Sequence, residues 1–186
     1  MNDKIKNLLI FGALLAVVLV GSNFLALVDV KIAGFTLILS MFIYPIIYLL
    51  LNFITRKCGF GWSLVAIFLA FVIQLAVYFI ANAISAGLIP GEVIIASLTA
   101  FVISTFINLL LFDKFDGMNK INFLTLFLIF IVVNIIDNFL FMFILNSSSG
   151  FGGQLVVDLT ISTLIKIAVS ALFVYVNLLL LRSKKA

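Results

Sequence analysis

A series of six long apolar runs, separated by short polar segments, constrains this chain more than any other feature. Each run has more than twenty residues, and a helix of about 20 residues spans the roughly 30 Å hydrocarbon core of a bilayer. Together the runs fill most of the 186 residues and leave no room for a separate soluble domain. We therefore expect an all-α membrane protein, a single bundle of six transmembrane helices over residues 5–27, 33–55, 62–84, 92–112, 121–145 and 155–181.

The composition agrees with a chain whose main solvent is lipid. Hydrophobic residues make up 66% of it and charged residues 10%, against about 45–50% and about 25% in soluble domains. The net charge is +4, but the basic residues gather at the ends of the apolar runs and do not form a patch interleaved with aromatic residues. We therefore expect no nucleic-acid partner and interpret the basic residues as topology signals.

Residue types that carry common catalytic chemistry are scarce. The chain has no histidine and one cysteine, Cys58, which excludes a disulfide scaffold and argues against a zinc site or a histidine-dependent triad. The sequence contains no nucleotide-binding glycine loop, metalloprotease motif or nucleophile elbow. We therefore expect neither an enzyme nor an ATPase, and neither a cofactor nor a metal site. Cys58 is interpreted as an inert thiol.

Lysine and arginine are unevenly distributed over the two ends of the apolar runs. With six spans, one side of the membrane receives Lys31 and the other side receives nine basic residues. Cytoplasmic segments of membrane proteins carry the excess of basic residues. We therefore predict a multi-pass protein of the cytoplasmic (inner) membrane with both termini cytoplasmic, on the side of Lys4, Lys6, Arg56, Lys57, Lys114, Lys120, Arg182, Lys184 and Lys185.

The first apolar run resembles a secretory signal peptide in one respect, because Lys4 and Lys6 precede it. It continues to residue 27, beyond the usual apolar core of about 7–15 residues, and no clear A-x-A cleavage site follows. A retained helix is therefore the preferred interpretation. Within it, Gly12 and Ala16 form a small-xxx-small pair suited to close helix packing, and Asn23 lies near the outer end.

Two ionisable residues lie well inside the apolar runs, where a charged side chain costs about 2.5–3.5 kcal/mol on insertion scales. Asp137 is eight residues from the outer end of the fifth run, and Lys166 is eleven from the outer end of the sixth. These positions differ by roughly 4–5 Å in depth, so the two side chains can pair. The pair is either a substrate or proton site near the midplane or a structural ion pair. We favour the site, because the neighbouring residues are polar too.

Polar residues form stripes on the last two helices, at spacings that place them on one helix face. Interhelical hydrogen bonds in membranes contribute only about 0.6 kcal/mol on average, which is a weak reason for so many polar residues. Two stripes on consecutive antiparallel helices therefore predict a shared polar cavity. The fifth-helix stripe holds Asn134, Asp137 and Asn138, and the sixth-helix stripe holds Ser162, Lys166, Ser170 and Asn177.

Further polar residues occur in the third and fourth runs. Gln74 lies near the middle of the third run, and Ser97, Ser104 and Asn108 share a face of the fourth. Each alone is explained by hydrogen bonding between helices. Together with Asp137 and the 21 phenylalanines they offer amide and carboxylate edges and aromatic faces, which suit a planar heterocyclic solute.

Pro45 lies in the middle of the expected second helix, beside Tyr44 and Tyr48. A proline inside a helix removes a backbone hydrogen bond, so we expect a kink at this position. Such kinks occur beside cavities and hinges, and also at places with no function.

Several short segments resemble the queuosine-precursor transporters, a bacterial family also called vitamin-uptake-transporter-like. Residues 21–25 (GSNFL), 44–48 (YPIIY) and 52–59 (NFITRKCG) resemble its first two helices. Residues 96–101 (ASLTAF) with Asn108 resemble its fourth helix. Residues 134–141 (NIIDNFLF) resemble its fifth helix, and residues 165–167 (IKI) resemble its sixth.

The resemblance implies a six-helix transporter that imports 7-deazaguanine precursors of queuosine, with Asn23, Asp137 and Lys166 at positions that the family's motifs emphasise. Asn52 and Asn108 stand where the family typically has aspartate, and the proline of the family's sixth helix is absent. Asparagine keeps the hydrogen bonding of aspartate without its charge, so these departures bear on ion coupling and on the substrate.

We therefore expect a secondary transporter for a small planar solute. The expected partners are that solute, the lipid bilayer and a second copy of the chain. Two alternatives stay open: the substrate-binding subunit of a modular vitamin importer, which needs ATPase and coupling subunits, and a structural membrane protein of the cell envelope, which binds no ligand. The candidate site residues are Asn23, Gln74, Asn108, Asn134, Asp137, Asn138 and Lys166.

Overall fold

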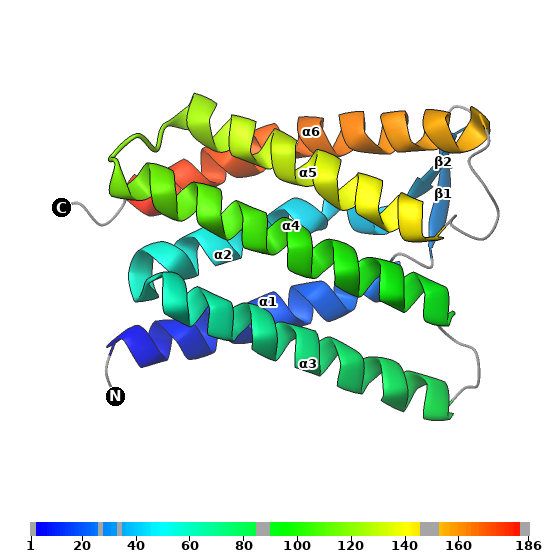
Figure 1. Ribbon diagram of the computed structural model, residues 1–186, viewed down its shortest axis with the longest axis horizontal. Helices are drawn as coiled ribbons and strands as arrows, with labels where there is room; N and C mark the ends of the chain where they lie inside the picture. The colour runs from blue at the N-terminus through cyan, green and yellow to red at the C-terminus, as the bar shows by residue number, and fades with distance from the viewer. Residues whose placement is uncertain (1–2, 26–27, 33–34, 85–89, 146–152, 183–186) are drawn as a thin grey trace.

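The computed structural model describes residues 3–25, 28–32, 35–84, 90–145 and 153–182 (Figure 1). These residues form six α-helices, one short 3-10 helix and a two-stranded antiparallel hairpin. The hairpin departs from the expected all-α fold. In chain order the elements are α1 (Asp3–Leu25), β1 (Asp29–Ile32), β2 (Phe35–Ile38), the 3-10 helix η1 (Leu39–Phe42), α2 (Tyr44–Cys58), α3 (Phe60–Ile84), α4 (Gly91–Gly117), α5 (Phe123–Leu145) and α6 (Gly153–Arg182).

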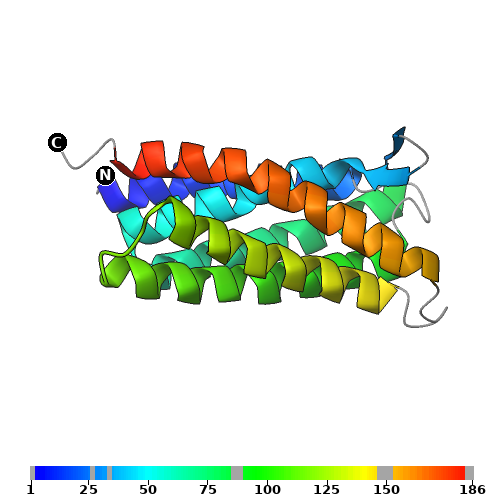
Figure 2. The same ribbon diagram turned by 90° about the horizontal axis from the view of Figure 1, so that it is seen from above.

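The helices lie side by side and run in alternating directions (Figures 1 and 2). α1 begins and α6 ends at one end of the bundle, which we name the termini end. β1 and β2 lie at the opposite end, which we name the hairpin end. This arrangement fits an even number of membrane crossings. That the termini end faces the cytoplasm stays a prediction from the basic residues.

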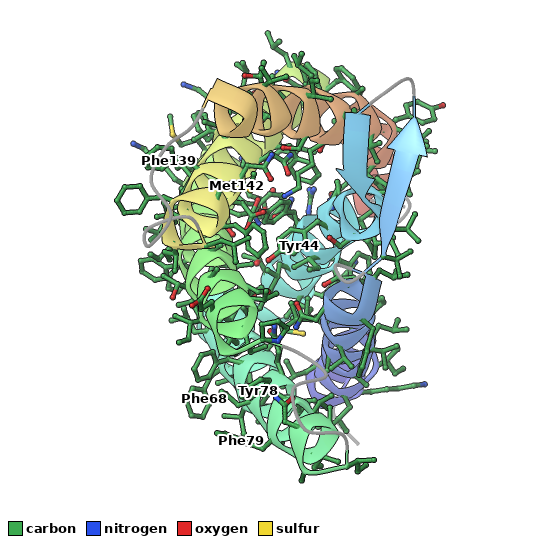
Figure 3. All side chains as sticks on the ribbon, turned by 90° about the vertical axis from the view of Figure 1, so that its right-hand side faces the viewer. Tyr44, Phe68, Tyr78, Phe79, Phe139 and Met142 are labelled. Atoms are coloured by element: carbon green, nitrogen blue, oxygen red, sulfur yellow. The ribbon has the colours of Figure 1, made fainter. Side chains whose placement is uncertain are left out.

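Five helices, α1, α3, α4, α5 and α6, are long and apolar enough to cross a membrane. Their outer faces carry large apolar side chains, and Figure 3 shows Phe68, Phe79 and Phe139 pointing away from the bundle. Each of these three rings is more than half exposed. Lipid is a far better solvent than water for such a surface. The chain is therefore a multi-pass membrane protein.

The second apolar run does not form the single helix expected over residues 33–55. Part of it belongs to the hairpin, in which Val30 pairs with Leu37, and η1 then precedes α2. β-Branched residues favour strands, and the first turn of a helix tolerates proline because the missing amide hydrogen has no partner there. Pro45 therefore lies in the first turn of α2, and the expected mid-helix kink is wrong.

α2 is short but central. Its 15 residues measure about 22 Å as a helix, less than the roughly 30 Å of a bilayer core. It nevertheless leads the chain from the hairpin end back to the termini end, packed against α1, α3, α4 and α6. Gly59 then reverses the chain into α3 with a φ of 99°, a conformation that glycine adopts without steric strain.

α4 is the most buried of the five long helices. Of its span 56% is buried, against 22% to 33% in the other four. It packs against α2, α3 and α5. The polar residues of α4 are therefore held in the interior of the bundle, where side chains from several helices reach them.

The sequence predicts close helix packing at both Gly12 and Ala16, and the structure has it only at Ala16. Ala16 is buried in the core, whereas a Cβ added at Gly12 meets nothing within 4 Å. Gly12 is half-buried on the same face as Ala16, so close packing along this face does not extend to Gly12.

Candidate functional site

The two ionisable residues expected inside the bundle are in contact. Lys166 Nζ on α6 lies 2.7 Å from Asp137 Oδ2 on α5. Asp137 is 2% exposed and Lys166 is 7% exposed, so neither side chain has free access to the surroundings. The pairing predicted from their depths is confirmed.

Two further helices complete the surroundings of this ion pair. Ser104 Oγ on α4 donates a hydrogen bond to Asp137 Oδ1 at 3.2 Å. Lys166 Nζ lies 4.8 Å from the centroid of the Tyr44 ring on α2, and Figure 3 shows Tyr44 in the interior of the bundle. An aromatic face attracts a cation, and a buried ion pair needs partners for its remaining lone pairs. We name Tyr44, Ser104, Asp137 and Lys166 the charged cluster.

Polar contacts continue along the seam between α5 and α6. Asn134 Nδ2 donates to Ser170 Oγ at 2.8 Å. Asn138 Nδ2 donates to Thr163 Oγ1 at 2.9 Å and to Ser162 Oγ at 3.2 Å. The stripes predicted on these two helices therefore face each other and meet in direct hydrogen bonds.

Asn23 and Gln74 belong to a different part of the bundle. Gln74 Nε2 on α3 donates to Ser97 Oγ on α4 at 3.4 Å, and Ser97 Oγ donates to Asn23 Oδ1 on α1 at 2.8 Å. We name these three residues the amide cluster. A crevice of about 10 Å³ beside Asn23, Gln74 and Tyr78 has room for one water molecule. The expectation that one site holds Asn23, Gln74 and Asp137 is therefore not met.

A third polar contact joins α4 to α2. Asn108 Nδ2 donates to Asn52 Oδ1 at 2.9 Å, and both residues are fully buried. The candidate list omitted Asn52 and Tyr44. A signal for both was present, because Tyr44, Tyr48 and Asn52 are spaced i, i+4 and i+8 and so share a face of α2.

Several buried polar atoms have no hydrogen-bond partner among the described residues. An unsatisfied buried polar group costs about 1–3 kcal/mol, so native proteins have few of them. Such atoms are places where water or a solute can bind. They are Tyr48 Oη, Asn52 Nδ2, Gln74 Oε1, Asn108 Oδ1, Asn134 Oδ1 and both amide atoms of Asn177.

The chemistry of these groups is that of polar recognition. Within the part of the chain that the structure describes, no three histidine, cysteine, aspartate or glutamate residues gather as metal ligands would. The groups present are one carboxylate, one ammonium, amides, hydroxyls and an aromatic ring. They can bind a solute that carries its own donors and acceptors, and Asp137 can hold a proton.

A larger hollow of about 240 Å³ lies between α4 and α5, away from these groups. Its lining is apolar except for Thr125 and includes Leu111, Leu128 and Val132. An open apolar surface of this kind is ordinary for helices that face lipid tails. The polar side chains thus mark a better candidate site than the larger hollow does.

Comparison of the chain with protein families, curated proteins and solved structures finds no match. The resemblance to queuosine-precursor transporters therefore stays a prediction. Of the seven candidate residues, the structure brings four together on α5 and α6: Asn134, Asp137, Asn138 and Lys166.

Proposed function

We propose that this chain is a secondary transporter that moves a small planar solute across the cytoplasmic membrane. Asp137 is the anchor for the solute or the proton site, and Lys166 is its partner. The observation that carries the proposal is the charged cluster, in which four helices surround one buried ion pair inside an apolar bundle.

Energetics favour a functional role for this pair over a purely structural one. Well-packed apolar residues can often replace a buried ion pair with no loss, or with a gain of about 1–4 kcal/mol, in stability. Helix packing alone is thus a weak reason for burying Asp137 and Lys166 in an apolar bundle. A solute that donates hydrogen bonds to Asp137, or a proton that binds it, can compete with Lys166 for the carboxylate. This competition couples binding to a rearrangement of α5 and α6.

The groups beside the pair support the class of solute that we propose. Asn134 Oδ1 is a buried acceptor without a partner, and the Tyr44 ring offers an aromatic face. A planar base with N–H and C=O groups fits such a lining. The resemblance to the queuosine-precursor transporters makes a 7-deazaguanine the first choice.

The orientation that we propose places the termini end in the cytoplasm. Arg56 and Lys57 lie in the last turn of α2, and Lys114 lies in the last turn of α4. Both turns are at the termini end of the bundle, which supports an inward-facing termini end by the positive-inside rule.

Uptake of labelled 7-deazaguanine bases into cells that lack their own importer tests this function. Cells with the parent chain are expected to accumulate the base well above cells without it. Asp137→Asn is expected to lower uptake to background, because the anchor loses its charge. The matched control is Asp113→Asn on the exposed end of α4, which is expected to keep full uptake. The amount of each variant in the membrane is measured alongside.

Two results would contradict the proposal at different points. If the parent accumulates no base above background, the assignment of the solute is wrong. If Asp137→Asn transports as well as the parent, the anchor role is wrong even where the solute is right. A chain with no ligand at all would be a structural protein of the envelope, in which the polar contacts only hold helices together.

The open face of α1 favours a second candidate, the substrate-binding subunit of a modular vitamin importer. Only 22% of the α1 span is buried, and its outward face exposes the apolar side chains of Leu9, Leu14 and Val17 to an approaching partner helix. Such a subunit binds solute by itself but transports it only with ATPase and coupling subunits. Binding of the base to the purified chain, with no uptake in cells that lack those subunits, would favour this candidate.

A further inference from the structure

The polar contacts of α4 lie on one helix face at three depths. Ser97, Ser104 and Asn108 are spaced i, i+7 and i+11, which returns to nearly the same direction in an α-helix. Ser97 belongs to the amide cluster, nearest the hairpin end, and Ser104 belongs to the charged cluster. Asn108 bonds Asn52 nearer the termini end. Polar groups therefore follow the buried face of α4 along much of the bundle.

An ion pair lies at one end of this polar column, and one buried aromatic residue interrupts it. Arg56 NH1 on α2 lies 3.7 Å from Asp116 Oδ1 on α4, and both side chains are about a quarter exposed, at the termini end. Phe101 is fully buried on the same face of α4, between Ser97 and Ser104. One aromatic side chain therefore separates the amide cluster from the charged cluster.

Between the charged cluster and the termini end lie buried hydrogen-bond donors and acceptors that have no partner in the described residues. Asn52 Nδ2 is a donor and Asn108 Oδ1 is an acceptor, and neither has a partner in the described residues although these amides bond each other. Tyr48, one helical turn from Asn52 on α2, is also fully buried, and its hydroxyl lies beside Ser104 of the charged cluster. An unused donor and an unused acceptor are thus carried by two adjacent neutral amides.

We propose that this face of α4 lines a polar path through the bundle, and that Asn52, Asn108 and Tyr48 form an inner binding position on it for a neutral lactam edge. An N–H of the solute donates to Asn108 Oδ1, and the neighbouring C=O accepts from Asn52 Nδ2. The inner position carries no charge and lies on the termini side of Asp137 and Lys166. This inference rests on the proposed transport function and extends it by a second contact point for the same solute.

The single cysteine of the chain allows a direct test. Cys58→Ser leaves a chain without cysteine, into which Asn108→Cys is introduced. The matched control is Leu110→Cys, two residues farther along α4, where the side chain is 45% exposed on the opposite face toward lipid. Membrane fragments that are open on both faces are treated with a small charged methanethiosulfonate, with and without 7-deazaguanine.

We expect Asn108→Cys to react at least about ten-fold faster than Leu110→Cys, because a thiol ionises in a polar, hydrated place and not in lipid. Because Asn108→Cys removes an acceptor of the proposed position, protection is measured at Thr105→Cys, which is fully buried about one turn away on α4 and keeps both amides. A saturating concentration of 7-deazaguanine is expected to slow the reaction of Thr105→Cys several-fold. The same concentration of 7-deazaadenine, which lacks the lactam edge, is expected to leave the rate unchanged. Asn52→Cys, on the facing helix, provides a second position if Asn108→Cys fails to insert.

Equal, slow reaction of Asn108→Cys and Leu110→Cys would overturn the polar path. Fast reaction of Thr105→Cys that 7-deazaguanine does not slow, in a chain whose parent takes up that base, would overturn the inner binding position alone. Absence of uptake by the parent together with absence of protection would overturn both this inference and the proposed function. The parent uptake assay therefore separates the two failures.

Discussion

The charged cluster joins α4 to α2, α5 and α6, whereas the amide cluster joins α4 to α1 and α3. In the charged cluster both oxygens of Asp137 have partners, and the ammonium of Lys166 has a carboxylate and an aromatic ring beside it. In the amide cluster, Gln74 Oε1 has no partner in the described residues, although a water-sized crevice adjoins it.

The two clusters differ because, inside an apolar bundle, the free-energy cost of a missing partner depends on whether the buried group is charged or neutral. A buried charge without a partner is far more costly than a neutral amide without one. Asp137 and Lys166 are therefore bound closely to each other, while neutral amides tolerate unused atoms that water or a solute can fill. In the function that we propose, a solute opens the charged cluster, and the neutral amides receive it. Four substitutions test this comparison.

Asp137→Asn should have the largest effect on stability, a loss of about 3–5 kcal/mol, because Lys166 is left buried without a counter-charge. Reversible unfolding of the purified protein in detergent micelles measures the loss. The double variant Asp137→Asn with Lys166→Gln should recover most of the stability but no uptake. If Asp137→Asn is as stable as the parent, the two charges do not depend on each other as proposed.

Tyr44→Leu should lower stability by about 0.5–2 kcal/mol, because the Lys166 ammonium loses the attraction of the aromatic face. Tyr44→Phe keeps the ring but loses the hydrogen bond of the hydroxyl with Asp137, so it should lose less stability than Tyr44→Leu. The same unfolding experiment compares the two variants. If Tyr44→Leu and Tyr44→Phe lose the same stability, the hydroxyl group of Tyr44 accounts for the loss. The contact between Lys166 and the ring would then contribute little.

Ser97→Ala tests the amide cluster and should cost about 1 kcal/mol, since it removes two hydrogen bonds between helices that each contribute about 0.6 kcal/mol. In a Gln74→Leu background, where one of these bonds is already absent, the loss should fall by about half. A loss as large as that of Asp137→Asn would remove the contrast between the two clusters.

Arg56→Ala should have the smallest effect, a few tenths of a kcal/mol, because its ion pair with Asp116 is partly exposed. The small loss should shrink further when the salt concentration is raised. Unfolding in low and high salt provides the measurement. A large loss of stability that does not change with salt would mean that this pair is as well shielded from solvent and ions as the pair of Asp137 and Lys166.

Much of the architecture could be predicted because a bilayer restricts what a chain can do. A helix that crosses lipid satisfies its own backbone polar groups, so run length alone locates α1, α3, α4, α5 and α6. The Asp137–Lys166 contact was predictable for a similar reason. Two opposite charges that differ by only roughly 4–5 Å in depth, on adjacent antiparallel helices, have few other partners.

The length of the second apolar run led to the wrong prediction of a single helix over residues 33–55. There the apolar residues continue from strand to helix without a polar break, so hydropathy does not separate the hairpin from α2. The pairing of β2 with β1 and the position of Pro45 in the first turn of α2 set the boundary instead.

Hydropathy is enough to predict a multi-pass membrane protein and to show which residues are too polar to face lipid. It does not show which of these residues meet: Ser97 bonds Asn23 across 74 positions, and Asn108 bonds Asn52 across 56. Those contacts depend on the folded bundle, because helices in a bilayer are apolar on nearly every face. Hydropathy then says little about how each helix is rotated, and packing against neighbouring helices sets that rotation.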